Sequence, residues 1–168
     1  MTDARDERDV LSALLQAQRR SVLAIVDGLD ERDMRRPAVL SGWTPLGMIE
    51  HLAHAERFWF TQVITATADP LSDCPPGEAE ADEGPFATSR PVHDVLAFYH
   101  EQVARSDEIL AGTPLDSRPA GRIPPDMADG IHTVRDVVLH MVEEVARHAG
   151  HLDIARELLD GATGLGPR

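Results

Sequence analysis

Apolar residues recur along this chain every three or four positions in four long segments, with polar residues between them. This spacing is typical of an amphipathic α-helix, and none of the four segments has the period of two that predicts a strand. The first segment spans about residues 6–29, and its apolar positions include Val10, Leu14, Leu15, Val22, Ile25 and Val26. The other three helices are expected at about residues 44–65, 91–112 and 133–160.

Residues that favour helix ends stand at the expected boundaries of the second and fourth helices. Thr44 is placed as an N-cap, and Pro45 follows it at the first helical position, where proline is favoured. Thr133 and Asp136 have the spacing of a capping box, with Asp in place of the usual Glu. Gly161 is suited to end the fourth helix. These signals agree with the apolar periodicity.

The connections after the second and third helices are long and rich in Pro, Gly and acidic residues. Four helices joined in this way predict a single all-α domain over residues 1–168, a four-helix bundle in which a long crossover connection is allowed. Cys74 is the only cysteine and lies in the first of these loops, so no internal disulfide can form. Whether the loop from Asp69 to Ser89 covers a site stays open.

Composition excludes several classes of function. A net charge of −13 argues against nucleic acid or an anionic membrane surface as a partner. No apolar run reaches the roughly 18 residues that a membrane span needs, and the charged N-terminus lacks the apolar core of a signal peptide, so we expect a cytoplasmic protein. The chain contains no lysine, which excludes Schiff-base chemistry and a Walker-type phosphate loop.

Histidine and glutamate residues follow a stripe along the fourth helix. At about 100° per residue, His140, Glu144, His148 and His151 fall within about 80° of one another, beside the apolar face. Glu144 and His148 are four residues apart, a spacing that lets two side chains on a helix grip one ion. A stripe of this kind is where a helical bundle can hold metal ligands.

The second helix carries His51 and His54, of which His51 is nearer the apolar face. Glu56 and Arg57 are expected to face solvent. Three ligands from two helices would leave one coordination position open, as in a catalytic site, and borderline metals such as zinc or nickel bind imidazole and carboxylate well. The alternative is a buried hydrogen-bonded network without a metal.

Aromatic and basic residues near these stripes have simpler interpretations. Trp43, Phe58 and Trp59 are expected to pack in the core or at the start of a helix, although one of them could line a substrate pocket. Arg147 and Arg156 flank the histidines and are expected at the surface, although either could receive an anionic substrate group.

Two segments, G-W-T-P…E-H-L-A-H-A-E-R-F-W and L-H-M-V-E-E-V-A-R-H-A-G-H-L-D-I-A-R-E-L-L-D-G, resemble the DinB-like superfamily. This group includes the YfiT-like proteins, the bacillithiol transferases and mycothiol-dependent maleylpyruvate isomerase. The resemblance implies a four-helix bundle in which three side chains hold a divalent metal, often zinc or nickel. These ligands map to His51, Glu144 and His148. His151 stands where many members have glutamine, and whether it replaces or supplements Glu144 stays open.

The resemblance and the stripe together indicate a metal-dependent enzyme with a small-molecule substrate. We expect an S-transferase or isomerase that uses a low-molecular-weight thiol such as mycothiol. The alternatives are a metal-dependent hydrolase that uses bound water, or a non-catalytic metal- or ligand-binding stress-response protein. A homodimer is plausible because two-fold dimers are common, but no sequence feature locates an interface.

Overall fold

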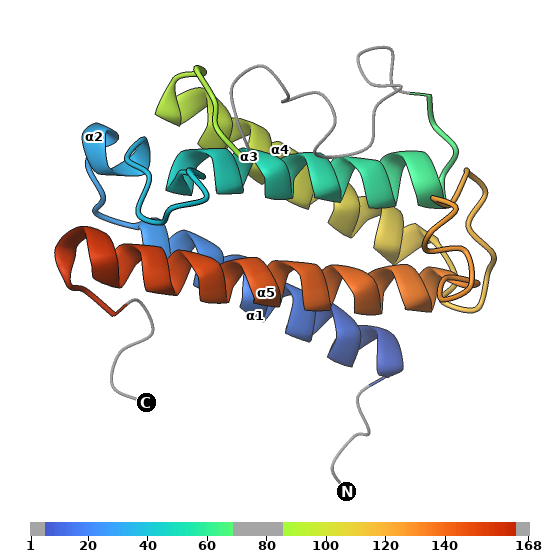
Figure 1. Cartoon of the computed structure of the whole chain (residues 1–168). Coiled ribbons are helices and arrows are strands. Elements are labelled where there is room, and N and C mark those ends of the chain that lie inside the picture. The colour runs from blue at the N-terminus through green and yellow to red at the C-terminus, as the bar shows by residue number, and fades with distance from the viewer. Residues whose placement is uncertain (1–5, 69–85, 164–168) are drawn as a thin grey trace, which may run out of the picture.

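Helices are the only regular elements in the computed structural model, which describes residues 6–68 and 86–163. They are α1 (Glu7–Val26), α2 (Glu31–Met34), α3 (Pro45–Glu56), η1 (Arg57–Ile64), α4 (Val92–Gly112) and α5 (Val134–Asp160). Counting α3 and η1 as one continuous helix, the four long helices form a bundle, as Figure 1 shows. The predicted all-α fold is confirmed.

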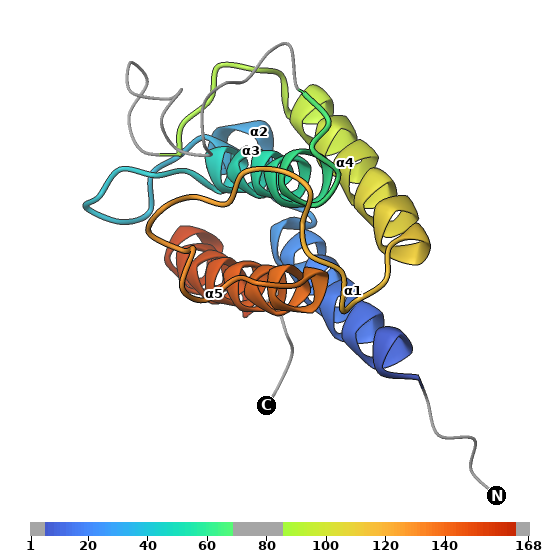
Figure 2. The same ribbon diagram turned by 90° about the vertical axis from the view of Figure 1, so that its right-hand side faces the viewer.

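The bundle has two layers of two helices each, with α1 beside α5 and α3 beside α4 (Figure 2). The α1 and α5 helices run in the same direction. Arg135, near the start of α5, pairs with Glu7 at the start of α1. Arg156, near the end of α5, donates hydrogen bonds to the carbonyls of Ile25 and Asp27 at the end of α1.

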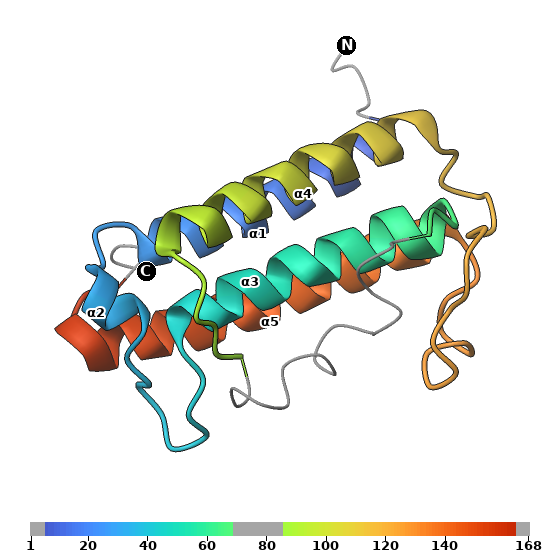
Figure 3. The same cartoon turned by 90° about the horizontal axis from the view of Figure 1, so that it is seen from above.

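The α3 and α4 helices also share a direction, opposite to that of α1 and α5. Glu50, early in α3, pairs with Arg90, which lies just before α4. Figure 3 shows α3 running along α5 and α4 along α1. Because η1 ends at one end of the bundle and α4 begins at the other, the connection between them is the long crossover that the sequence allowed.

The predicted helix ends are confirmed at three places. The Thr44 hydroxyl accepts a hydrogen bond from the backbone N–H of Gly47, with Pro45 at the first helical position of α3. Thr133 and Asp136 form a reciprocal capping box at the start of α5. Gly161 ends α5 in the left-handed conformation, with φ of 80°, which glycine adopts without steric cost.

The segment after α1 differs from the prediction. α1 ends at Val26 rather than near residue 29, and a short helix, α2, follows. The Asp30 side chain caps α2 by accepting from the N–H of Asp33, and Met34 is buried in the core. The sequence predicted no helix between about residues 29 and 44.

The second long helix changes geometry midway. Its first half, α3, is an α-helix, but η1 is a π-helix, in which backbone hydrogen bonds join residues five apart. Each residue of η1 therefore turns less around the axis than in an α-helix. Trp59 consequently stays near the side of the helix that carries His51, and it contacts α5. The sequence predicted one uninterrupted α-helix here.

The core lies between the two layers and is lined by aliphatic and aromatic side chains. Phe60, Tyr99, Leu15, Leu52 and Met141 are among its largest fully buried members. Among the described helices, none is both long enough and apolar enough to span a membrane.

Candidate metal centre

His51 of α3 and Glu144 and His148 of α5 meet between the two layers of the bundle. The Nε2 atoms of His51 and His148 lie 3.1 and 3.0 Å from the same carboxylate oxygen, Oε1 of Glu144. One potential ligand atom from each residue lies within 4.8 Å of the others, so a single metal ion could contact all three. Both imidazoles are buried, whereas 22% of the Glu144 side chain is exposed. Solvent therefore reaches the cluster at Glu144.

Helical geometry explains why these three residues converge. Glu144 and His148 are one turn apart on α5, which places their side chains on one face. His51 reaches them because α3 lies along α5 in the opposite direction (Figure 3). The sequence predicted that these residues would converge, and the structure brings them together.

Hydrogen bonds from His148 and His51 hold the pKa of Glu144 well below its ordinary value, although partial burial acts in the opposite direction. Glu144 is therefore a carboxylate at neutral pH. Two imidazoles and one carboxylate form a donor set that suits a borderline divalent cation. Within the described residues the same groups also form a hydrogen-bonded network. The two interpretations of the sequence, a metal site and a network without a metal, therefore involve the same side chains.

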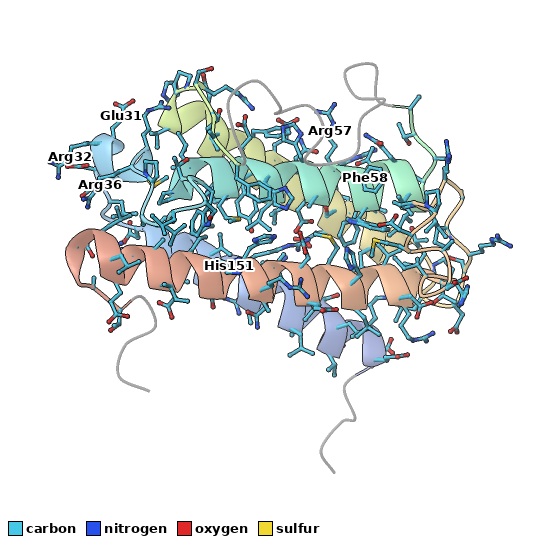
Figure 4. The ribbon with its side chains drawn as sticks, viewed as in Figure 1. Glu31, Arg32, Arg36, Arg57, Phe58 and His151 are labelled. Atoms are coloured by element: carbon cyan, nitrogen blue, oxygen red, sulfur yellow. The ribbon has the colours of Figure 1, made fainter. Side chains whose placement is uncertain are left out.

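His151 lies beside the cluster rather than in it. Its Nδ1 atom is 3.3 Å from Nδ1 of His148, and the group of potential metal ligands among the described residues does not include it. The side chain is exposed midway along α5 (Figure 4) and lies near Trp43, with ring centroids 6.3 Å apart. Partial burial, His148 and Arg147 lower the pKa of His151.

The other two histidines of these stripes point elsewhere. His140 is half-buried and packs against Trp59, with ring centroids 4.6 Å apart, and burial lowers its pKa. His54 turns toward α4 and packs against Phe98, with centroids 5.0 Å apart. The two histidines of α3 therefore serve different interfaces.

Phe86 covers the cluster, a role that sequence analysis did not identify. Its ring centroid lies 4.4 Å from that of His51 and 5.9 Å from that of His148. Its backbone carbonyl accepts a hydrogen bond of 3.2 Å from the N–H of Thr44. A Cβ atom at Gly47 would lie 1.7 Å from this carbonyl oxygen, so only glycine at that position lets Phe86 approach α3 so closely. The sequence feature that indicates this close contact is Gly47, a glycine in the first turn of a helix.

The expected solvent exposure of Glu56 was wrong. Glu56 is fully buried and accepts two hydrogen bonds from Arg19 of α1, at 2.7 and 2.6 Å. Arg19 is itself buried and also pairs with Asp107 of α4 at 2.7 Å. A bidentate partner compensates the charge, which makes burial of this carboxylate possible. Arg57, which Figure 4 labels, is only partly exposed, and its guanidinium lies over the ring of Phe98.

The other residues that the sequence analysis singled out lie in ion pairs or pack against the core. Arg147 pairs with Glu143 at 3.0 Å on the exposed face of α5. Arg156 is less exposed than expected, because its guanidinium binds Asp160 and the carbonyls of Ile25 and Asp27 at the end of α1. Trp59 is buried, and Trp43 and Phe58 pack partly buried against the core. Cys74 and most of the loop from Asp69 to Ser89 lie outside the described residues.

One of three comparisons with known proteins found a match. A family model described as Mycothiol-S-transferase matches residues 10–161, which contain all three residues of the cluster. Searches of curated proteins and of solved structures gave no match. The match extends over most of the chain and is consistent with the DinB/YfiT-like resemblance seen in the two motifs. The chain therefore belongs to the mycothiol S-transferase family.

Proposed function

We propose that this protein is a metal-dependent mycothiol S-transferase in which His51, Glu144 and His148 hold one divalent cation, zinc or nickel. The observation that carries the proposal is the convergence of one ligand atom from each of these residues within 4.8 Å. Family membership supports the thiol-transfer part of the proposal.

The residues present fit such a cation. Imidazole nitrogen and carboxylate oxygen are common ligands of zinc and of nickel. Glu144 contributes a negative charge at neutral pH, because its pKa is held below the ordinary value. Three protein ligands leave a coordination position free, which distinguishes catalytic from structural zinc sites. The partial exposure of Glu144 gives that position access to solvent and to a small substrate.

Each residue of the cluster has a definable task. His51 and His148 would bind through Nε2, because these atoms already lie against Glu144. The proton that each Nε2 donates to the carboxylate would have to leave that nitrogen when the cation binds. Phe86 lies against both rings and would limit the access of water from its side. A bound divalent cation lowers the pKa of a thiol and so makes the thiolate available at neutral pH.

The test begins with protein purified without a histidine tag. We expect about one equivalent of zinc or nickel per chain. We also expect thiol transfer from mycothiol to a chromogenic electrophile, and this transfer should disappear on chelation and return when the metal is restored. His51→Ala and Glu144→Ala should lose both metal and activity. The matched control, His93→Ala, removes a histidine that is 83% exposed on α4 and should change neither.

Two outcomes would contradict the proposal. One is wild-type protein that binds no stoichiometric metal. The other is metal-dependent turnover of an ester or amide that proceeds equally well without any thiol, because that would indicate a hydrolase that uses bound water.

A further inference from the structure

His148 makes hydrogen bonds through both of its ring nitrogens. Nε2 lies 3.0 Å from Oε1 of Glu144, and Nδ1 lies 3.3 Å from Nδ1 of His151. A neutral imidazole carries one proton, so one of its nitrogens donates and the other accepts. The carboxylate of Glu144 only accepts, so without a cation Nε2 donates and Nδ1 accepts. A cation bound at Nε2 takes the place of that proton, and Nδ1 must then carry the proton and find an acceptor.

His51 lacks such a contact. Its Nδ1 atom is buried, and no described residue forms a hydrogen bond with it. Of the two imidazoles in the cluster, His148 is therefore the one whose Nδ1 atom forms a hydrogen bond with a described side chain.

We propose that His151 is a positioning residue that accepts a hydrogen bond from Nδ1–H of His148 and so directs the Nε2 lone pair of His148 toward the cation. This inference rests on the proposed function. It assigns His151 a role beside the metal ligands, in answer to the question that the sequence left open. Partners of this kind fix the tautomer and the ring orientation of ligating histidines in many metal sites.

The local geometry indicates that His151 positions His148 and does not itself bind the cation. His151 is three residues after His148 on α5, so the two side chains are neighbours on one face. The Nδ1 atom of His151 is directed at His148, and its single lone pair is occupied when it accepts that proton. The ring also lies near Trp43, which borders it on another side.

The first experiment measures zinc affinity by competition with a chromophoric chelator. His151→Ala should bind zinc about 10–100-fold more weakly than wild type, the usual effect of removing such a partner. His151→Asn should restore most of the affinity, because its side-chain oxygen can accept a hydrogen bond at nearly the same place. The exposed control His93→Ala should bind as wild type does. Equal affinities of wild type and His151→Ala would overturn the inference.

The second experiment separates positioning from ligation. Nitrogen NMR of zinc-loaded protein with labelled histidines should show two metal-bound imidazole nitrogens, from His51 and His148, in wild type and in His151→Ala. The Nδ1–H signal of His148 should be protected from exchange in wild type and lose that protection in His151→Ala. Three metal-bound imidazoles in wild type would make His151 a ligand and overturn the inference.

These results also separate this inference from the proposed function. If wild type binds zinc tightly while His151→Ala is indistinguishable from it, only the role of His151 fails. If wild type binds no zinc, the proposed function fails and the role of His151 fails with it.

Discussion

Two carboxylates join α3 to neighbouring helices, and they are held in opposite ways. Glu56 faces α1 and receives two hydrogen bonds from the guanidinium of Arg19, one on each oxygen. Glu144 faces α3 from α5, and two imidazoles approach the same one of its oxygens. Glu56 is fully buried, whereas 22% of the Glu144 side chain is exposed.

The chemistry of the partners explains why the cluster around Glu144, and not the one around Glu56, has donor atoms that suit a cation. A guanidinium is always charged and has no lone pair to offer, so Arg19 compensates Glu56 and leaves nothing for a cation. Burial alone would lower the pKa of Arg19, but Glu56 and Asp107 together raise it. A neutral imidazole carries a lone pair and no charge. The cluster around Glu144 therefore keeps a negative charge and has nitrogen atoms that can bind a cation. The same carboxylate chemistry thus stabilises the fold in one place and suits metal binding in the other.

The largest effect is expected from breaking the buried ion pair. Glu56→Ala should lower the free energy of unfolding by about 3–5 kcal/mol, because Arg19 would stay buried without its main partner. Urea denaturation measures this change. The matched control is Glu143→Ala, which removes an exposed ion pair with Arg147 and should cost no more than about 0.5 kcal/mol. A loss for Glu56→Ala as small as that of the control would show that the pair does not stabilise the bundle.

The double variant Arg19→Met/Glu56→Leu sharpens this result. Well-packed apolar residues often replace a buried ion pair without loss of stability. The double variant should therefore be more stable than Glu56→Ala alone, and its zinc affinity should equal that of wild type. A strong loss of zinc binding in a folded double variant would mean that the two clusters are not independent.

A smaller effect is expected from metal binding itself. Zinc at 100 times its dissociation constant should stabilise wild type by about 2.7 kcal/mol, since the ion binds only the folded chain. His51→Ala should lose this stabilisation while staying folded, which thermal melts with and without zinc would measure. If zinc raised the melting temperature of His51→Ala as much as that of wild type, the ion would be bound elsewhere.

The smallest effect concerns pH. The folded-state pKa of Glu144 is lowered from 4.5, so its ionised form stabilises the metal-free fold above that pH, and this contribution is lost as pH falls through the folded-state value. The free energy of unfolding should therefore decline more steeply below about pH 4.5 in wild type than in Glu144→Gln. Parallel pH profiles for the two proteins would contradict the lowered pKa.

The convergence of the predicted ligands could be derived from the sequence because it depends on spacing along regular helices. The positions of Glu144 and His148 follow from one turn of α5, and His51 follows from the apolar register of α3. The helix ends at Thr44 and Thr133 likewise depend on local side-chain to backbone bonds.

The buried ion pair was missed because each charged residue was interpreted on its own. Arg19 follows the buried Leu15 by four positions, and Glu56 follows the buried Leu52 by four, so both stand in the core register of their helices. Opposite charges at core positions of two helices can predict a buried ion pair. This prediction can be made only once it is known that the two helices are neighbours.

Other features depend on contacts that no local pattern encodes. The π-helical geometry of η1 and the position of Phe86 over His51 result from packing between distant segments. The α2 helix is an exception, because its Asp30 cap is a local signal that could have been recognised.

The most direct test of the central claim is X-ray absorption spectroscopy on zinc-loaded, untagged protein. It should show zinc bound by two imidazole nitrogens and a carboxylate oxygen, and the imidazole contribution should fall in His148→Ala. A zinc ion bound by the sulfur of Cys74, or an imidazole contribution unchanged by His148→Ala, would contradict the claim that His51, Glu144 and His148 form the metal site.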